Sequence, residues 1–233
     1  MTRWILSALL LIAAQTARGQ LSQENFGIYV TLTSDYRFRG VSQTLNDPAL
    51  QAGVDLQLPS GFFAGVWASN VDFFSNQFRS EPRDVEVDLY AGYSIEFHDD
   101  WSSVFSAVFY GYPGSSVDYD YAEVFAGLNY RDLATLQIGY SNDALARGEA
   151  ALNYELGVQY PLATSWEIGG ILGYFDTSRL FDRSYAYGNV GLSKTWPRLV
   201  LDLRYHDTDD DAVALFRSYA GSRWVLSLSV PVM

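Results

Sequence analysis

The sequence is dominated by runs in which apolar and polar residues alternate strictly. From Asp84 to Phe97, every odd position is apolar or aromatic, and every even position is an acid, a serine, a glycine or a tyrosine. Period-two alternation puts the two sets on opposite faces of a β-strand, whereas a helix would scatter them around its axis. Similar runs occupy residues 50–58, 122–130, 152–160 and 199–205. The pattern predicts an all-β chain built from half-apolar strands.

The spacing of these runs predicts a barrel. We predict twelve strands, at residues 26–38, 49–58, 62–72, 84–97, 101–111, 120–130, 134–141, 149–161, 165–176, 185–195, 199–206 and 222–232. Tight turns at 59–61, 98–100, 131–133, 162–164 and 196–198 alternate with long polar loops. Outer-membrane barrels alternate short periplasmic turns with long outer loops in this way. We therefore predict a transmembrane antiparallel up-and-down β-barrel over residues 20–233, with short periplasmic turns and long outer loops.

A soluble sandwich or a lipocalin-like barrel is the alternative fold, and it would turn the same strands inside out. Two features favour the membrane barrel. The non-apolar face carries Gly, Tyr, Asn and Gln as well as acids, as a crowded lumen would. Aromatic residues also lie in the apolar register near strand ends, where an interfacial girdle belongs. These are Tyr93, Phe97, Tyr130, Tyr160 and Trp166.

The N-terminus has the pattern of a secretory signal peptide. Arg3 precedes the apolar run "WILSALLLIAA", and the small residues Ala17 and Gly19 follow. The apolar run is too short to cross a bilayer as a helix, which disfavours a retained anchor. We expect cleavage of residues 1–19, export through the periplasm and residence in the cell outer membrane.

Composition excludes several classes of function. Without residues 1–19, the chain has 13 basic and 27 acidic residues and a formal charge of −14, which disfavours binding to nucleic acid. The chain has no cysteine, and its two histidines, His98 and His206, are far apart in sequence. We expect no cofactor and no metal site. The expected partners are outer-membrane lipids and lipopolysaccharide, the barrel-assembly machinery, small solutes and, as an open alternative, further copies of the chain.

The segment from Tyr29 to Phe73 carries a family resemblance. Its motifs "TSDYRFRGVSQT", "DPALQAGVD" and "GFFAGVWASNVDF", with "EVDLYAGY" and "YGYPG" further on, closely resemble the start of the TorF family of bacterial porins, also described as the conserved Gcw_chp family. The resemblance implies an outer-membrane barrel with a channel role. One departure is the last residue, Met233, because outer-membrane barrels commonly end on an aromatic residue.

The stretch "SDYRFRG" combines charges with rings. Continuing the alternation of the first strand puts Tyr36 and Phe38 outward, at the lipid interface, and Asp35, Arg37 and Arg39 in the lumen. The arginines could pair with inward acids and clamp the first long loop, or they could form a charged constriction that selects solutes. Because unpaired buried charges are costly, we favour the clamp.

The inward faces carry more acids than bases. The acids are Asp35, Asp55, Glu86, Asp88, Glu96, Glu123, Glu155, Glu167 and Asp202, and the bases are Arg37, Arg39 and Arg204. This excess of six negative charges predicts a lumen that favours cations. The faces of Trp67, Asn70 and Asp72 are not assigned, because apolar residues occupy both registers of 62–72 and a bulge would fit there.

Strand number and inward rings limit the width of the lumen. Twelve strands lie between the filled eight-stranded barrels and the open sixteen-stranded pores, which predicts a narrow or partly plugged passage. Inward rings narrow it further: Tyr29, Tyr90, Phe125, Tyr185 and Tyr187. We predict a porin-like channel for small solutes, lined by Asp35, Arg37, Arg39, Asp55, Glu86, Asp88, Tyr90, Glu123, Glu155, Asp202 and Arg204.

Two other functions stay open. A closed structural or adhesive barrel would have the same strands. A lipid-modifying enzyme would need a base beside a nucleophile, and His206 is the only candidate base. No nucleophile motif accompanies it, so we predict that the protein is not an enzyme. The acid run "DTDDD", residues 207–211, fits a solvated loop or a divalent-cation contact at the lipopolysaccharide surface.

Overall fold

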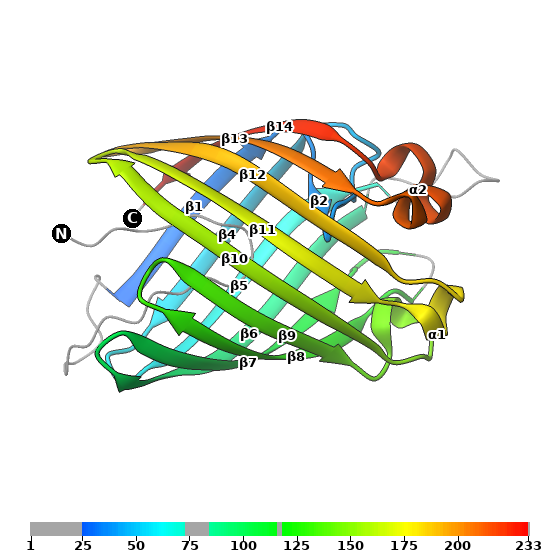
Figure 1. Cartoon of the computed structure of the whole chain (residues 1–233), viewed down its shortest axis with the longest axis horizontal. Coiled ribbons are helices and arrows are strands. Elements are labelled where there is room, and N and C mark those ends of the chain that lie inside the picture. The colour runs from blue at the N-terminus through cyan, green and yellow to red at the C-terminus, as the bar shows by residue number, and fades with distance from the viewer. Residues whose placement is uncertain (1–24, 73–83, 116–117, 233) are drawn as a thin grey trace.

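The chain folds into a closed antiparallel β-barrel of twelve strands in the computed structural model, which describes residues 25–72, 84–115 and 118–232 (Figure 1). The barrel strands are β1 (Phe26–Thr33), β4 (Ala49–Gln57), β5 (Phe62–Val71), β6 (Asp84–His98), β7 (Trp101–Gly111), β8 (Tyr121–Tyr130), β9 (Ala134–Ser141), β10 (Ala151–Ala163), β11 (Trp166–Asp176), β12 (Tyr185–Trp196), β13 (Leu199–Thr208) and β14 (Arg223–Pro231). Each strand pairs with its neighbour in sequence, and β1 closes the ring against β14. The predicted fold and strand number are confirmed. The signal-peptide prediction and Met233 lie outside the described residues.

The two ends of the barrel differ. At one end, here called the turn end, tight turns join the strands and β1 begins. At the other, the loop end, longer connections carry the short elements β2 (Arg37–Phe38), β3 (Val41–Ser42), η2 (Ala144–Ala146), α1 (Ser178–Phe181), α2 (Asp210–Phe216) and η3 (Arg217–Tyr219). Figure 1 shows α1 and α2 together at the loop end. None of the helices in the described part of the chain has the length and apolar character needed to cross a membrane.

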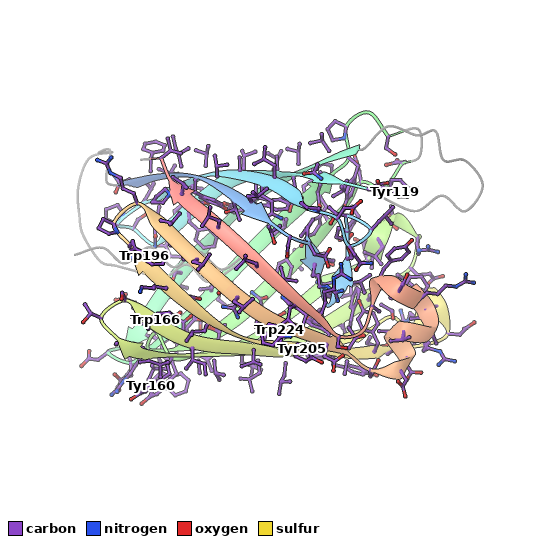
Figure 2. All side chains as sticks on the ribbon, turned by 90° about the horizontal axis from the view of Figure 1, so that it is seen from above. Tyr119, Tyr160, Trp166, Trp196, Tyr205 and Trp224 are labelled. Atoms are coloured by element: carbon purple, nitrogen blue, oxygen red, sulfur yellow. The ribbon has the colours of Figure 1, made fainter. Side chains whose placement is uncertain are left out.

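The apolar register points out of the barrel and the charged register points in. Leu89 and Val124 are 50% and 54% exposed, whereas Glu86 and Glu123 on the same two strands are 3% and 2% exposed. This orientation is the reverse of a soluble lipocalin-like barrel. Rings form a band near each end of the outer face, with Tyr160, Trp166 and Trp196 at the turn end and Tyr205 and Trp224 toward the loop end (Figure 2).

The first strand is shorter than predicted. The alternation suggests a strand to residue 38, but β1 ends at Thr33 and the chain then turns into the lumen. Residues 34–44, here called the lumen hairpin, contain β2 and β3, which form a separate two-stranded sheet. Arg39 and Gly40 join β2 to β3 with φ of 48° and 80°, and positive φ at both central residues is what a type I′ turn requires.

The prediction that Tyr36 and Phe38 face lipid is therefore wrong. Tyr36 is 4% exposed inside the barrel, where its ring lies 5.2 Å from that of Trp67, and Phe38 packs against Tyr110 at 5.8 Å. The physical reason is that the alternation continues from β1 into β2 without interruption, although the chain has left the barrel wall between them.

The acid run at residues 207–211 has a structural role. Asp209 caps α2, because its carboxylate accepts hydrogen bonds from the backbone nitrogens of Ala212 at 3.0 Å and Ala186 at 2.7 Å. Asp211 forms an ion pair with Arg183. No group of three or more potential metal ligands occurs among the residues that the structure describes.

Candidate functional site

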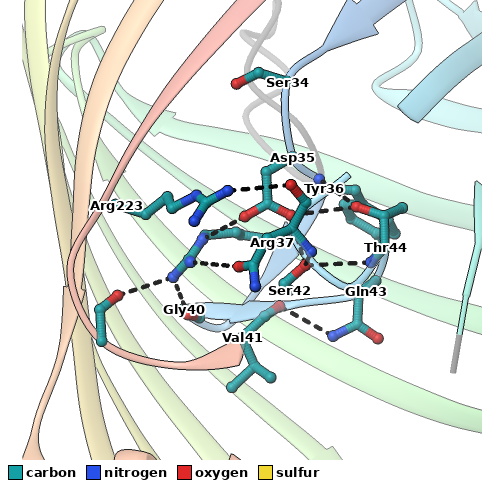
Figure 3. A network of polar contacts seen from close by, with 12 residues as sticks. Ser34, Asp35, Tyr36, Arg37, Gly40, Val41, Ser42, Gln43, Thr44 and Arg223 are labelled. Carbon is teal, nitrogen blue, oxygen red and sulfur yellow. Dashed lines mark hydrogen bonds and ion pairs between the residues drawn. The ribbon is translucent and has the colours of Figure 1, made fainter. Parts of the chain in front are cut away.

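The lumen hairpin is organised around the carboxylate of Asp35 (Figure 3). This side chain accepts hydrogen bonds from Arg37 Nε at 2.8 Å, Ser42 Oγ at 2.5 Å and Thr44 Oγ1 at 3.2 Å. All of these donors lie within the hairpin, and Asp35 itself is buried. The carboxylate therefore holds the two ends of the hairpin together.

Arg37 attaches the hairpin to the segment between η3 and β14. Its Nη1 donates to the carbonyl of Gly40 at 2.8 Å and to that of Gly221 at 2.9 Å, and its Nη2 lies 3.4 Å from Asn46 Oδ1. Arg223 Nη2, on the last strand, donates to the carbonyl of Asn46 at 3.1 Å. Figure 3 shows this network between the hairpin and the last strand.

Arg39, at the tip of the hairpin, is clamped to the opposite wall. Its guanidinium donates to both carboxylate oxygens of Glu123, at 2.9 and 2.5 Å. It also stacks on the rings of Phe38 and Phe175, at 4.6 and 4.1 Å from their centroids. Both charged side chains are nearly inaccessible, at 5% and 2% exposure. Arg37 and Arg39 are thus paired with Asp35 and Glu123, in agreement with the clamp hypothesis.

Aromatic packing fills the loop-end half of the lumen around the hairpin. On one side, Tyr36 belongs to a buried cluster that includes Trp67, Tyr110, Tyr112, Tyr121 and Phe125. On the other side, Val41 packs with residues of η2, α2, the loop ends of several strands and the segment before β14: Ala144, Ala151, Phe175, Tyr185, Tyr187, Ala212 and Ala220. The hairpin is therefore a plug with packing on both sides.

The register of β5 assigns the faces left open by the sequence. Pairing with β6 runs without interruption from Phe62 to Val71, so no bulge is present. Trp67 faces inward and is buried. Asn70 faces outward, and its Oδ1 accepts from the backbone nitrogen of Leu50 at 2.7 Å. Asp72 follows the last residue of β5, and its backbone nitrogen donates to the carbonyl of Gln43 at 2.8 Å, which attaches the end of the hairpin to the end of that strand.

Two inward acids of β6 lie deep in the wall beside the plug. Glu86 accepts a hydrogen bond from the hydroxyl of Tyr112 at 3.0 Å. Asp88 is fully buried between Trp67 and Tyr110 on the flanking strands, and neither carboxylate oxygen has a partner among the described residues. Because these groups are inaccessible, they do not line the open part of the lumen.

A cavity of about 250 Å³ extends from the hairpin into the turn-end half of the lumen. Its charged lining includes Glu155, Asp202 and Arg204, together with Asp35, Arg37 and Arg39 of the hairpin. Its neutral polar lining combines hydroxyl groups with five amides: Gln51, Gln137, Gln159, Asn153 and Asn189. Arg204 donates to Asp202 at 2.9 Å and to Asn189 at 3.0 Å. The hydroxyl of Tyr187 lies 2.8 Å from a carboxylate oxygen of Glu155 and 2.9 Å from Asn153 Oδ1, and either oxygen can accept its proton. A polar solute would find both donors and acceptors here.

The sequence profile of one protein family, described as "Bacterial protein of unknown function (Gcw_chp)", matches residues 17–230. The chain belongs to the Gcw_chp family. No curated protein matches this Gcw_chp chain by sequence. The family description names no activity, so the channel role implied by the TorF resemblance is a proposal.

Solved structures similar to the Gcw_chp barrel include several porins. A KdgM porin structure superposes with a TM-score of 0.55 at 12% identity and covers 88% of this chain and 98% of its own. A NanC porin structure gives 0.55 at 13% identity, with the same coverage. A structure titled "KdgM porin in complex with disordered oligogalacturonate" gives 0.54 at 11% identity. At these identities the likeness establishes the fold alone.

The Gcw_chp barrel brings some of the predicted site residues together and separates others. Asp35, Arg37, Arg39 and Glu123 join in the hairpin clamp. The first three of these also line the cavity, together with Glu155, Asp202 and Arg204. Asp55 faces inward and accepts a hydrogen bond from the hydroxyl of Tyr90. Glu86 and Asp88 are enclosed beside the plug.

Sequence reasoning missed the hairpin and the amides of the cavity. The hairpin has a signal in Gly40, which follows Arg39 at the centre of an alternating stretch, as a two-residue turn would require. The amides have none, because inward Gln and Asn also occur in barrel walls that bind nothing. His206, the candidate base, faces inward on β13 and lines the cavity two residues from Arg204.

Proposed function

We propose that this Gcw_chp protein is an outer-membrane channel of the porin type, which passes small polar solutes and is narrowed by its lumen hairpin. The observation that carries the proposal is the way in which the lumen hairpin is attached to the barrel wall. The hairpin lies outside the barrel ladder. It is attached to the wall by side-chain contacts and by one backbone hydrogen bond near each of its ends, from Ser34 to Leu226 and from Asp72 to Gln43, so it can move while the twelve-stranded wall stays intact. The apolar outer face supports the membrane location, with the turn end toward the periplasm.

The lining of the lumen favours small cations over anions in this proposal. Each of Arg37, Arg39 and Arg204 pairs with an acid, so these pairs carry no net charge. Asp55 and Glu155 instead accept hydrogen bonds from the hydroxyls of Tyr90 and Tyr187, which leaves their negative charges without a cationic partner in these contacts. A polyanion such as the oligogalacturonate named for the KdgM complex would meet an unfavourable field here.

Movement of the hairpin would have to break the bidentate contact between Arg39 and Glu123 and the contact between Arg37 and Gly221. Charge-assisted contacts of this kind are strong when buried, because each partner is otherwise left uncompensated. The proposed resting state therefore has low conductance, with brief openings when the clamp is released.

Planar-bilayer recording of the refolded protein tests the function. We expect discrete current steps of small amplitude and, in a salt gradient, a reversal potential of cationic sign. The variant Glu123→Gln should open more often, while the matched variant Gln137→Glu, which changes a cavity amide on β9, should alter selectivity without altering the open time. Absence of steps from the wild type and from Glu123→Gln would overturn the channel proposal.

A closed structural barrel is the second candidate, and the dense packing of the loop-end half favours it. Both apolar clusters and the buried pair of Arg39 and Glu123 would stabilise a permanent plug as well as a movable one. The double variant Arg39→Gln/Glu123→Gln separates the two candidates. A movable plug gives conductance after this change, whereas a permanent plug stays silent although the protein still migrates as a folded barrel.

A further inference from the structure

The chain contains one lysine, Lys194, and it lies on the apolar outer face. The pairing of β12 with β11 and β13 puts Lys194 beside Trp166 and Leu201, both of which face outward. Among the outward positions of the twelve strands described, Lys194 is the only lysine or arginine. The only acids in that register, Asp176 and Asp207, lie near the opposite, loop end. An isolated charge in an apolar band is costly, so a counter-charge is expected beside it.

Two indole rings hold the ammonium in position. Lys194 Nζ lies 4.6 Å from the ring centroid of Trp166 and 4.8 Å from that of Trp196. Both distances are within the range of a cation–π contact. The rings belong to the aromatic band at the turn end (Figure 2), which marks the depth of the lipid headgroups in a barrel of this kind. Lysine side chains at that depth extend toward the headgroups while their methylene groups stay in the apolar layer.

The turns at the turn end of the barrel also differ in charge. Arg198, in the turn that follows β12, is exposed and adds a second cation near Lys194. The turns beside β6 to β9 contain Asp99, Asp100 and Asp132 instead, and their cation, Arg131, is paired with Asp100 at 2.8 Å. This contact lowers the pKa of the Asp100 carboxyl, so the pair stays ionised and carries no net charge.

We infer that Lys194, framed by Trp166 and Trp196, is a binding site for the phosphate of an anionic phospholipid in the leaflet at the turn end. The ammonium supplies the charge and donates to phosphate oxygens, and the two rings supply an apolar rim for the glycerol and upper acyl chain. Arg198 strengthens the local field from the turn. The inference rests on the membrane location of the barrel and not on its conducting, so its failure leaves the channel proposal standing.

Lipid selectivity of the reconstituted full-length protein tests the site. Spin-labelled phosphatidylglycerol and phosphatidylcholine, each at trace level in phosphatidylcholine vesicles, report the lipids in contact with the barrel. We expect the wild type and Lys194→Arg to prefer phosphatidylglycerol, and Lys194→Gln to lose about fivefold in that preference. Arg131→Gln is the matched control, since it removes a paired cation at the same end and should keep the preference. Equal contact of both lipids with the wild type, or an unchanged preference in Lys194→Gln, would overturn the inference.

Two further measurements cover a variant that does not fold and the binding of free phosphate. If Lys194→Gln does not fold, the folded wild type can be acetylated instead, which neutralises the amines of Lys194 and of the N-terminus. Acetylation should abolish the preference for phosphatidylglycerol. An acetylated protein that keeps this preference would overturn the site. Inorganic phosphate is then added to the detergent-solubilised protein. A rise in melting temperature in the wild type but not in Lys194→Gln would assign the site to free phosphate and overturn the lipid assignment, whereas no rise in either supports it.

Discussion

The two halves of the lumen are built from the same strands but organised in opposite ways. In the loop-end half, inward residues such as Asp88, Val108 and Tyr110 are at most 2% exposed, because the hairpin occupies the space between the walls. In the turn-end half, Gln159 and Asp202 are only partly buried and line a cavity. Strand number alone therefore does not determine how much of a barrel is open. The loop that folds inward determines where the open part ends.

The largest expected difference is in the loss of stability when an inward acid is replaced by alanine. Glu123→Ala removes the partner of Arg39, whose guanidinium stays buried, and should lower the free energy of unfolding by about 3–5 kcal/mol. Glu155→Ala in the cavity wall removes a hydrogen bond from Tyr187 and should cost about 1 kcal/mol. Urea unfolding of both variants in detergent micelles measures this. Equal losses would mean that the packed clamp and the cavity wall do not differ in packing.

A pair of glycines gives the second comparison. At Gly40, with φ of 80°, an added Cβ would lie 2.5 Å from Thr208 Cγ2 and 2.8 Å from Tyr187 Cβ, so Gly40→Ala should cost about 1–3 kcal/mol and displace the hairpin tip. At Gly157, in the cavity wall, the same Cβ would meet no atom within 4 Å. Gly157→Ala should therefore be tolerated. A stable Gly40→Ala barrel with unchanged conductance would show that the tip does not need this turn.

The two parts of the lumen should also differ in how readily a water-soluble reagent reaches their side chains. The chain has no cysteine, so single cysteines report one site each. Asn189→Cys, in the cavity wall, should react readily with a small water-soluble maleimide. Ser69→Cys, beside Glu86 in the packed half, should react only when the hairpin moves, because Ser69 is buried. Similar rates at both positions would contradict a closed loop-end half.

The smallest expected effect is on ion selectivity. Arg204→Gln leaves Asp202 without its cation in the cavity and should raise the cation preference slightly, while Asp202→Asn should lower it. Reversal potentials in a salt gradient measure both shifts. Shifts of the same sign would indicate that this pair lies off the path of the ions.

The sequence predicts the wall of this barrel better than its contents. Alternation in 84–97 and 122–130 fixes the faces of β6 and β8, because a side chain in a strand has only two directions to point. The same rule fails at Tyr36 and Phe38, since local alternation does not report whether a strand belongs to the barrel or to a hairpin inside it. The pairing of Arg39 with Glu123 spans 84 residues and depends on how far the hairpin reaches, which no local pattern encodes.

The contacts of Arg37 also bear on the order in which the chain assembles. The seam between β1 and β14 consists of five residue pairs, and the hairpin bonds to Gly221 across a separation of 184 residues. These bonds cannot form until β14 has paired with β1, so the hairpin is secured only when the barrel closes. Contacts so distant along the chain form slowly. A newly folded molecule would thus pass through a short-lived stage with a finished wall and an unsecured interior, during which its lumen is at its widest.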